Sequence, residues 1–332
     1  MVLKDIDFGV VLGQSGVQGF FGEGDEYPHH RWYKFIPGFS MYGLGFVAKT
    51  TGVDSRIYPE KSNTELEQIY KLKRFLPKSI WVSVRSFFGG YMLNAMGIPT
   101  PGAKKLFTLK KLQKRKEPFQ LSYMPEGKMR ADKIQDAMAF AHLVEAYLHP
   151  DYYQYGMQVN FSCPNTEHEK DELGDIIAIL QELRKWLPKV PLIPKFDLMI
   201  KPKIISELKE YCDAFCIGNS LGFGSHVNGL HWDKLFKDSK SPLTKHFDGK
   251  FKGGLSGRPL FPVLVDWLEE MQEYDSSVKI IAGGGIMKKA DITTLSKFSI
   301  VKAVALGSVA TLRPWRMRGL INHARKLFVN RK

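Results

Sequence analysis

The fold is decided by the stretch Gly156-Met157-Gln158-Val159-Asn160-Phe161-Ser162-Cys163-Pro164-Asn165-Thr166. Its first half alternates apolar and polar residues, which predicts a strand, and Pro164 ends that strand because proline cannot donate to a ladder. Apolar residues then recur at helical spacing between positions 173 and 187, so a helix follows. Asn160, Cys163 and Asn165 therefore stand at the carboxyl end of a strand that leads into a helix, where parallel α/β folds bind their ligands.

These three side chains have two interpretations. A thiol between two amides is suited to moving a proton beside a planar, polar molecule. Alternatively, Cys163 is a small buried apolar residue, and the asparagines only shape the turn. This stretch alone does not decide between the two.

The rest of the chain repeats the pattern of strand followed by helix. Strands are expected at residues 7–12, 45–48, 119–123, 156–161, 191–196, 214–217, 278–282 and 301–306, and helices at 65–76, 134–148, 173–187, 260–271 and 317–328. Eight strands that alternate with helices predict a (β/α)₈ TIM barrel that forms a single domain over residues 1–332. An accessory strand at 80–84 and irregular loops at 19–38 and 222–250 are expected outside the barrel, over its C-terminal face.

Composition limits the class of protein. The 332 residues are 44% hydrophobic and contain no apolar run long enough to span a membrane. The three cysteines are too few for a disulfide framework and lack the spacing of a metal site, so we expect a reducing cytoplasmic location and no metal. The net charge of +14 fits either RNA binding or a solvated basic surface, and we favour the surface.

Two glycine clusters follow the last two predicted strands. They are Gly283-Gly284-Gly285 and Gly307-Ser308, and a third cluster, Gly253-Gly254-Leu255-Ser256-Gly257, is expected to open a helix. Loops in these positions of a barrel commonly hold a phosphate on backbone N–H groups. A Cβ would keep the anion away from those groups, so the clusters predict a phosphate site, with plain turns as the alternative.

Polar groups stand at the ends of the other strands. The set comprises Lys49, Asn94, Asn160, Cys163, Asn165, Lys195, Asn219 and Ser220. A flavin fits between this set and the phosphate site, where Lys195 would stabilise negative charge at the pyrimidine edge of a reduced flavin. The asparagines offer donors and acceptors to a substrate such as a pyrimidine ring.

These motifs resemble those of the dihydroorotate dehydrogenase family. The resemblance rests on residues 159–166, which are similar to the family's active-site strand and loop, and on Asn94-Ala95-Met96-Gly97-Ile98, which is similar to its substrate loop. Ala48-Lys49-Thr50, Lys195, Asn219-Ser220 and the glycine clusters follow in family order, so the resemblance covers residues 7–312.

The resemblance implies an FMN enzyme that oxidises dihydroorotate to orotate in pyrimidine synthesis. It implies that Cys163 is the base that takes the C5 proton, while the C6 hydride goes to flavin N5. The implied substrate ligands are Lys49, Asn94, Met96, Gly97, Ile98, Asn160, Asn165, Asn219 and Ser220. The implied cofactor ligands are Ser15, Gly16, Lys49, Thr50, Asn160, Lys195, Gly253, Gly254, Gly284, Gly285, Gly307 and Ser308.

Within the family, a cysteine base marks the soluble branch, whereas the membrane-associated, quinone-reducing branch usually has serine. Two segments, 51–90 and 222–252, depart from the family pattern and leave the substrate and the electron acceptor open. The acceptor could be fumarate, NAD through a separate electron-transfer subunit, or a quinone. A homodimer is also compatible with the resemblance.

Three alternatives belong to other functional classes. A tRNA dihydrouridine synthase-like FMN enzyme would explain the basic charge, and RNA binding that fails even at low salt would exclude it. A related dihydropyrimidine oxidoreductase would differ only in its substrate. A flavin-binding module without chemistry would need neither Cys163 nor Lys195, and it would leave the flavin oxidised after anaerobic mixing with dihydroorotate.

Overall fold

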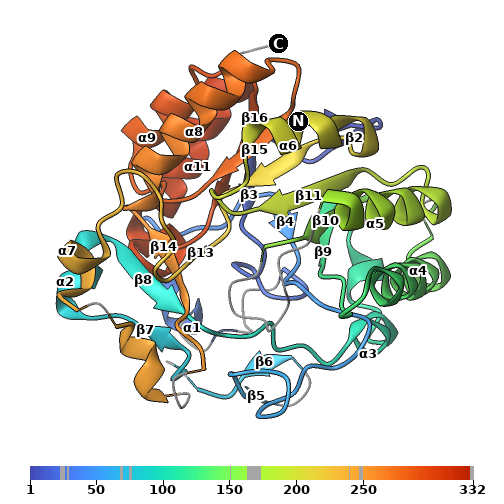
Figure 1. Cartoon of the computed structure of the whole chain (residues 1–332), viewed down its shortest axis with the longest axis horizontal. Coiled ribbons are helices and arrows are strands. Elements are labelled where there is room, and N and C mark those ends of the chain that lie inside the picture. Colours follow the sequence, from blue (N-terminus) through green and yellow to red (C-terminus); the bar gives the residue numbers. More distant parts are fainter. Residues whose placement is uncertain are drawn as a thin grey trace.

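The computed structural model describes residues 1–22, 27, 30–67, 70–74, 77–149, 151–162, 173–238, 240–246 and 250–329. Eight parallel strands form one sheet that curves into a barrel (Figure 1). In spatial order they are β3 (Val11–Gly13), β16 (Val301–Leu306), β15 (Ile280–Gly283), β12 (Phe215–Ile217), β11 (Leu192–Phe196), β10 (Tyr155–Asn160), β9 (Phe119–Tyr123) and β4 (Phe46–Val47). This arrangement confirms the predicted (β/α)₈ TIM barrel, and each barrel strand overlaps a predicted one.

The barrel closes between its first and last strands, β3 and β4. Leu12 bridges to Gly45 in parallel register, and Gly45 N–H donates to the Val11 carbonyl at 2.8 Å. A Cβ at position 45 would lie 2.4 Å from the Leu12 side chain and 2.8 Å from the Phe8 carbonyl. Glycine is therefore required at this seam, because any side chain would force the two strands apart.

Helices surround the barrel and bury their apolar faces against the strands. They are α3 (Ala103–Thr108), α4 (Arg130–Tyr147), α5 (Leu173–Trp186), α6 (Pro202–Leu208), α8 (Leu260–Tyr274), α9 (Lys289–Leu295), α10 (Val309–Leu312) and α11 (Met317–Val329). In Figure 1, α4 and α5 lie on the right, and α8, α9 and α11 lie at the upper left. Val144, Leu183, Leu264 and Ile321 are fully buried, which confirms the predicted core faces of α4, α5, α8 and α11.

A second sheet covers part of the barrel mouth and confirms the predicted accessory strand. Its antiparallel strands run in the order β13 (Leu221–Gly222), β14 (Gly254–Gly257), β8 (Tyr91–Asn94) and β7 (Ile80–Trp81). β7 and β8 come from the connection after β4, and β13 and β14 come from the connection after β12. Two insertions far apart in the chain therefore meet in one sheet, at the lower left of Figure 1.

Two predicted elements were wrong. The helix expected at residues 65–76 is instead a hairpin of β5 (Leu66–Glu67) and β6 (Lys71–Leu72) in the described part of that stretch. Residues 253–257 do not open a helix, because Gly254–Gly257 pairs as strand β14 and α8 begins at Leu260. The long loops also contain short helices, α1 (His30–Tyr33) and α7 (Trp232–Phe236), while α2 (Val84–Gly89) joins β7 to β8.

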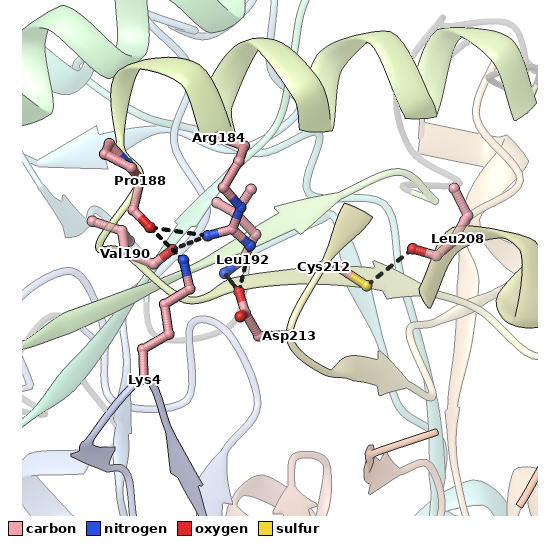
Figure 2. Close-up of polar contacts among 8 residues, drawn as sticks. All are labelled: Lys4, Arg184, Pro188, Val190, Leu192, Leu208, Cys212 and Asp213. Atoms are coloured by element: carbon pink, nitrogen blue, oxygen red, sulfur yellow. Dashed lines mark hydrogen bonds and ion pairs between the residues drawn. The ribbon is translucent and has the colours of Figure 1, made fainter. Parts of the chain in front are cut away.

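An N-terminal hairpin closes the other end of the barrel. β1 (Val2–Leu3) pairs with β2 (Ile6–Asp7), and Leu3 and Phe8 pack into the apolar interior of the barrel. Figure 2 shows the polar contacts beside it: Lys4 donates to the Pro188 carbonyl, and Arg184 pairs with Asp213 at 2.6 Å. Apolar packing and paired charges therefore seal this end.

Candidate active site

A cavity of about 250 Å³ lies at the carboxyl ends of the barrel strands. Most of the predicted site residues line it: Ser15, Gly16, Lys49, Thr50, Asn94, Met96, Gly97, Ile98, Asn160, Lys195, Asn219, Ser220, Gly284, Gly285, Gly307 and Ser308. Residues from seven barrel strands or the loops that follow them, and from the accessory strand β8, thus converge on one site. The ligand site of such a barrel usually lies where the loops after its strands meet.

Two lysines make this cavity cationic. Lys49 is 9% exposed; its Nζ donates to the Pro99 carbonyl at 2.7 Å and lies 5.0 Å from the centre of the Phe20 ring. Lys195 is 4% exposed on β11, beside Asn160 of β10. No carboxylate lines the cavity among the residues that the structure describes. The cavity is therefore suited to an anionic or electron-rich ligand.

Amides and hydroxyls at the cavity form two hydrogen-bonded groups. Asn219 Nδ2 donates to Asn160 Oδ1 at 3.0 Å and to the Ser162 carbonyl at 2.5 Å. Asn94 Nδ2 donates to Ser220 Oγ at 3.2 Å, and Ser220 Oγ lies 3.1 Å from Ser256 Oγ. These bonds fix the amide planes before a ligand arrives, which lowers the entropy cost of binding.

A chain of hydroxyls links the ends of three barrel strands. Ser15 Oγ donates to the Ala48 carbonyl at 3.0 Å and lies 2.8 Å from Thr50 Oγ1. Thr50 Oγ1 lies 2.8 Å from Ser122 Oγ on β9. Because this chain runs from the residues after β3 and β4 to β9, it ties the barrel seam to the neighbouring strand.

The turns after β15 and β16 form an open backbone cradle. Gly284 and Gly285 both have positive φ, 108° and 76°, and a Cβ on Gly284 would meet only the Gly218 Cα at 3.6 Å. Successive residues in this region turn their N–H groups to one side, which makes an anion-binding nest. Gly307 and Ser308 line the cavity beside it. The residues present therefore fit a phosphate group.

The loop from Asn94 to Pro99 contains a strained turn. Ile98 has a φ of 53°, which is unfavourable for a β-branched residue, and Gly97 before it has a φ of 71°. Arg56, which is 8% exposed, holds this turn: its Nε donates to the Gly97 carbonyl at 3.2 Å, and its Nη1 pairs with Glu126 at 3.1 Å. Arg56 therefore supports the backbone that faces the ligand.

Sequence reasoning missed several residues here. Arg56 lies in the segment that departs from the family pattern, and its partners are distant in sequence. Gln14 directly precedes Ser15 and Gly16, which were predicted as cofactor ligands. That position in the sequence could have identified Gln14 as a residue of the site. Tyr27, His30, Ser256, Gly257 and Thr311 also line the cavity.

Four predicted residues are not among those that line the cavity. Gly253 and Gly254 lie at the accessory sheet, where Gly254 pairs with Asn94, so their place at a phosphate stays a prediction. Cys163 and Asn165 lie outside the described residues. Their neighbour Ser162 is described, and Asn219 holds it at the cavity.

Fold and cavity together define a (β/α)₈-barrel protein with a cationic, amide-rich ligand site beside a phosphate cradle. Within that class, the chain belongs to the dihydroorotate dehydrogenase family, whose sequence model matches residues 83–297. This membership favours the predicted family over the dihydrouridine synthase alternative. Proteins of this family generally use a flavin.

Curated relatives carry two kinds of name. "Dihydroorotate dehydrogenase A (fumarate)" of Lactobacillus delbrueckii subsp. bulgaricus is 24% identical over 221 residues, covering 65% of this chain and 66% of the relative. "Dihydroorotate dehydrogenase B (NAD(+)), catalytic subunit" of Fusobacterium nucleatum subsp. nucleatum is 24% identical over 226 residues, covering 68% of each chain. The match thus spans about two thirds of each relative.

The described residues contain neither a membrane-spanning helix nor a metal-ligand cluster. None of the described helices is long and apolar enough to cross a membrane. Likewise, the described histidine, cysteine, aspartate and glutamate side chains form no group of three that could hold a metal ion.

Proposed function

We propose that this protein is an FMN-dependent dihydroorotate dehydrogenase that oxidises (S)-dihydroorotate to orotate in pyrimidine synthesis. The observation that carries the proposal is the convergence of Lys49, Asn94, Asn160, Lys195 and Asn219 on one cavity beside the cradle at Gly284. These residues were selected from sequence order alone, and chance would not collect them around one space. Membership of the family supports the same activity.

The amide set would hold the substrate. Dihydroorotate is a cyclic diamide with a carboxylate, so it presents donors, acceptors and one negative charge. Asn94, Asn160 and Asn219 offer both kinds of hydrogen-bonding group, and Lys49 offers a positive charge to the carboxylate. The backbone of the turn at Gly97 and Ile98, together with Met96 and Ser220, would complete the binding surface. Asn165 is proposed as a further ligand.

Other residues of the same cavity, together with Lys49 and Asn160, would hold the cofactor. Ser15, Gly16, Thr50, Lys49 and Asn160 would contact the ring, and the cradle of Gly284, Gly285, Gly307 and Ser308 would hold the phosphate on backbone N–H groups. Lys195 would stabilise negative charge at the pyrimidine edge of the ring. Bound FMN would supply an acceptor for the hydride that leaves substrate C6.

Cys163 is proposed as the base. Its thiolate would take the C5 proton and become a thiol, so the carbon–hydrogen bonds at C5 and C6 are both lost as the ring double bond forms. A free thiol has a pKa near 8.5. A neighbouring cation favours the thiolate form, and Lys49 is the proposed source of that charge.

Anaerobic mixing with dihydroorotate tests the proposal. The purified yellow protein is expected to lose its absorbance near 450 nm, as reduced flavins do, with about one orotate released per flavin. If the absorbance stays and no orotate forms, the protein is not a dihydroorotate dehydrogenase. Dihydrouracil, which lacks the carboxylate, is the matched substrate control, and its failure to bleach the flavin would separate this enzyme from a general dihydropyrimidine oxidoreductase.

For the electron acceptor, more than one candidate is proposed. Fumarate and a separate electron-transfer subunit are both candidates, and reoxidation of the bleached protein by fumarate alone distinguishes them. We retain as predictions a single domain, a cytoplasmic location, a homodimer and no binding of nucleic acid. Size-exclusion chromatography and a gel shift at low salt test the last two.

A further inference from the structure

Gln14 is a cavity residue whose side chain has an unusual position. It follows strand β3, and its backbone N–H donates to the Leu306 carbonyl at the end of β16 at 2.8 Å. A Cβ added to Gly283 would lie 2.0 Å from Gln14 Nε2, and one added to Gly307 would lie 3.1 Å from Gln14 Cγ. The glutamine side chain therefore lies across the ends of β15 and β16, in space that side chains at 283 and 307 would fill.

Those two glycines have no conformational reason to be glycine. Unlike Gly284 and Gly285, neither Gly283 nor Gly307 has a positive φ. Any residue could adopt their backbone geometry. The Gln14 side chain occupies the space that a Cβ at either position would need, so glycine at both strand ends accommodates this one side chain.

The side-chain amide nitrogen of Gln14 makes no hydrogen bond to the described residues. This atom, Nε2, is buried. A buried amide group without a partner lowers the stability of the folded protein. The two ends of an amide are almost the same shape, so a rotation of the group can bring either its donor or its acceptor to the cavity that Gln14 lines.

The position of Gln14 indicates what meets that amide. Ser15 and Gly16 line the cavity at the proposed flavin ring. The turns at Gly284 and Ser308 line it at the proposed phosphate. Gln14 directly precedes Ser15, and its side chain lies against Gly283 and Gly307 beside those turns, so it is placed to meet the chain that joins the flavin ring to its phosphate. That chain is a polyol, whose hydroxyl groups donate and accept hydrogen bonds.

We propose that Gln14 is a cofactor-binding residue that hydrogen-bonds the polyol chain of the flavin. This inference rests on the proposed flavin function and adds a ligand to it. Loss of the amide should weaken the binding of flavins that carry the chain, and it should not weaken the binding of the bare ring. Lumiflavin, which has a methyl group in place of the chain, therefore separates this role from a general effect on the cavity.

The test uses flavin-free protein titrated with FMN, riboflavin and lumiflavin, with quenching of flavin fluorescence as the readout. Gln14→Leu keeps the volume of the side chain and removes both hydrogen-bonding groups. We expect its Kd for FMN and riboflavin to rise about tenfold, which corresponds to about 1.4 kcal/mol for the loss of one buried hydrogen bond. The Kd for lumiflavin should stay within about twofold of the native value.

Gln113→Leu is the matched control. Gln113 also has a buried amide atom without a partner, Oε1, but its Nε2 donates to the carbonyls of Phe107 and Tyr147, away from the cavity. Its substitution should leave all three flavin affinities unchanged. Circular dichroism of each variant confirms that it has folded.

A second pair of variants tests the geometry. Gly283→Ala alone should weaken FMN binding, because the new methyl group collides with the Gln14 amide. In a Gln14→Ala background the same substitution should cost much less, since the colliding group is gone.

Each outcome is decisive. Unchanged FMN affinity in Gln14→Leu, or an equal loss for lumiflavin, overturns the role of Gln14 while native flavin reduction by dihydroorotate still supports the proposed function. If native protein binds none of the three flavins, both proposals fall together.

Discussion

The two ends of the barrel are built on opposite electrostatic principles. At the amino-terminal end, Arg184 Nη2 meets Asp213 Oδ2 at 2.6 Å, and the same carboxylate accepts the Leu192 N–H at 2.8 Å (Figure 2). At the carboxyl-terminal mouth, Lys49 and Lys195 are more deeply buried than Arg184, yet no carboxylate lines the cavity among the described residues. One end pairs a guanidinium with a carboxylate, and the other places two buried lysines at a cavity that no described carboxylate lines.

The closed end of the barrel contributes to stability, whereas the open end is built for binding. Paired charges and a packed hairpin at the closed end contribute to the free energy of folding and need no ligand. Buried lysines, the strained turn at Ile98 and the partnerless amide nitrogen of Gln14 all cost stability at the open end. Features that are costly to folding are found where binding can offset them. Matched substitutions at the two ends should therefore have different consequences.

The largest contrast should come from two cysteines. Cys163→Ala is expected to lower the turnover of dihydroorotate about 10²- to 10⁴-fold, the range for losing a general base, while the flavin stays bound. Steady-state kinetics with an artificial electron acceptor, together with the visible spectrum, measure both. Cys212→Ala at the closed end, where the thiol donates to the Leu208 carbonyl, should keep native turnover. Native turnover in Cys163→Ala would remove the thiol from the mechanism.

Two lysines give the next contrast. Lys195→Met keeps most of the side-chain volume and removes the charge, so FMN affinity should fall about ten- to hundredfold, as for a lost charge-assisted hydrogen bond. Fluorescence titration of flavin-free protein measures it. Lys4→Met, at the hairpin of the closed end, should leave the affinity unchanged. Equal affinities in both variants would contradict a cationic site at the mouth.

Arg184→Met should affect stability rather than activity. Its guanidinium contacts Asp213 and the Val190 carbonyl, and its loss leaves that carboxylate without its ion-pair partner. The free energy of unfolding is expected to fall by about 1–3 kcal/mol. Urea unfolding measures the change, and turnover at 25 °C should remain native. A loss of turnover in a folded variant would mean that the two ends are coupled.

Arg56→Met should act through the substrate loop. Without the guanidinium, the turn at Gly97 and Ile98 loses a hydrogen bond that holds its strained backbone. We expect the KM for dihydroorotate to rise about tenfold, because small displacements of positioning groups are costly, with FMN affinity unchanged. Lys73→Met, which removes an exposed pair with Glu65, is the control. An unchanged KM would show that the turn holds without Arg56.

The smallest effect concerns pH. Burial raises the pKa of Asp136 to about 6, against the lowering effect of hydrogen bonds from the Tyr123 hydroxyl and the Glu126 N–H. In the unfolded chain the same carboxyl titrates near 4, so the folded state holds the extra proton between about pH 4 and pH 6. The contribution of this group to stability is full below about pH 4 and is lost as pH rises through about 6.

Asp136→Asn should remove that dependence. Urea unfolding at several pH values is expected to show the native protein losing stability relative to the variant as pH rises through this window. Asp266→Asn, at an exposed position, is the control and should follow the native curve. A constant difference between native protein and Asp136→Asn at every pH would contradict the raised pKa.

The barrel strands were predictable because of where they lie. β9 was predicted as residues 119–123 and β16 as residues 301–306, and both match the structure. A parallel strand covered on both faces reads as a short apolar run, and the glycines or polar residues after it mark its end. For the same reason, most site residues could be selected from sequence, since they directly follow such runs.

The accessory elements were not predictable in this way. Strand β14 looks like a glycine-rich turn because its pairing partner, Asn94, is 160 positions away. The hairpin of β5 and β6 was mistaken for a helix because strands of two residues show no period. Arg56 and Gln14 were missed because their roles depend on distances to Gly97 and Gly283, which no local pattern encodes.

Sequence by itself therefore determined the barrel, the order of its strands and the residues at their carboxyl ends, because hydrophobic period and turn chemistry are local properties. Only the tertiary structure decided that two distant insertions meet over the mouth, that Arg56 supports a strained turn and that Gln14 lies across two glycines. Those arrangements arise from packing between segments far apart in the chain, where a few tenths of an ångström between non-neighbouring atoms decide which side chain fits.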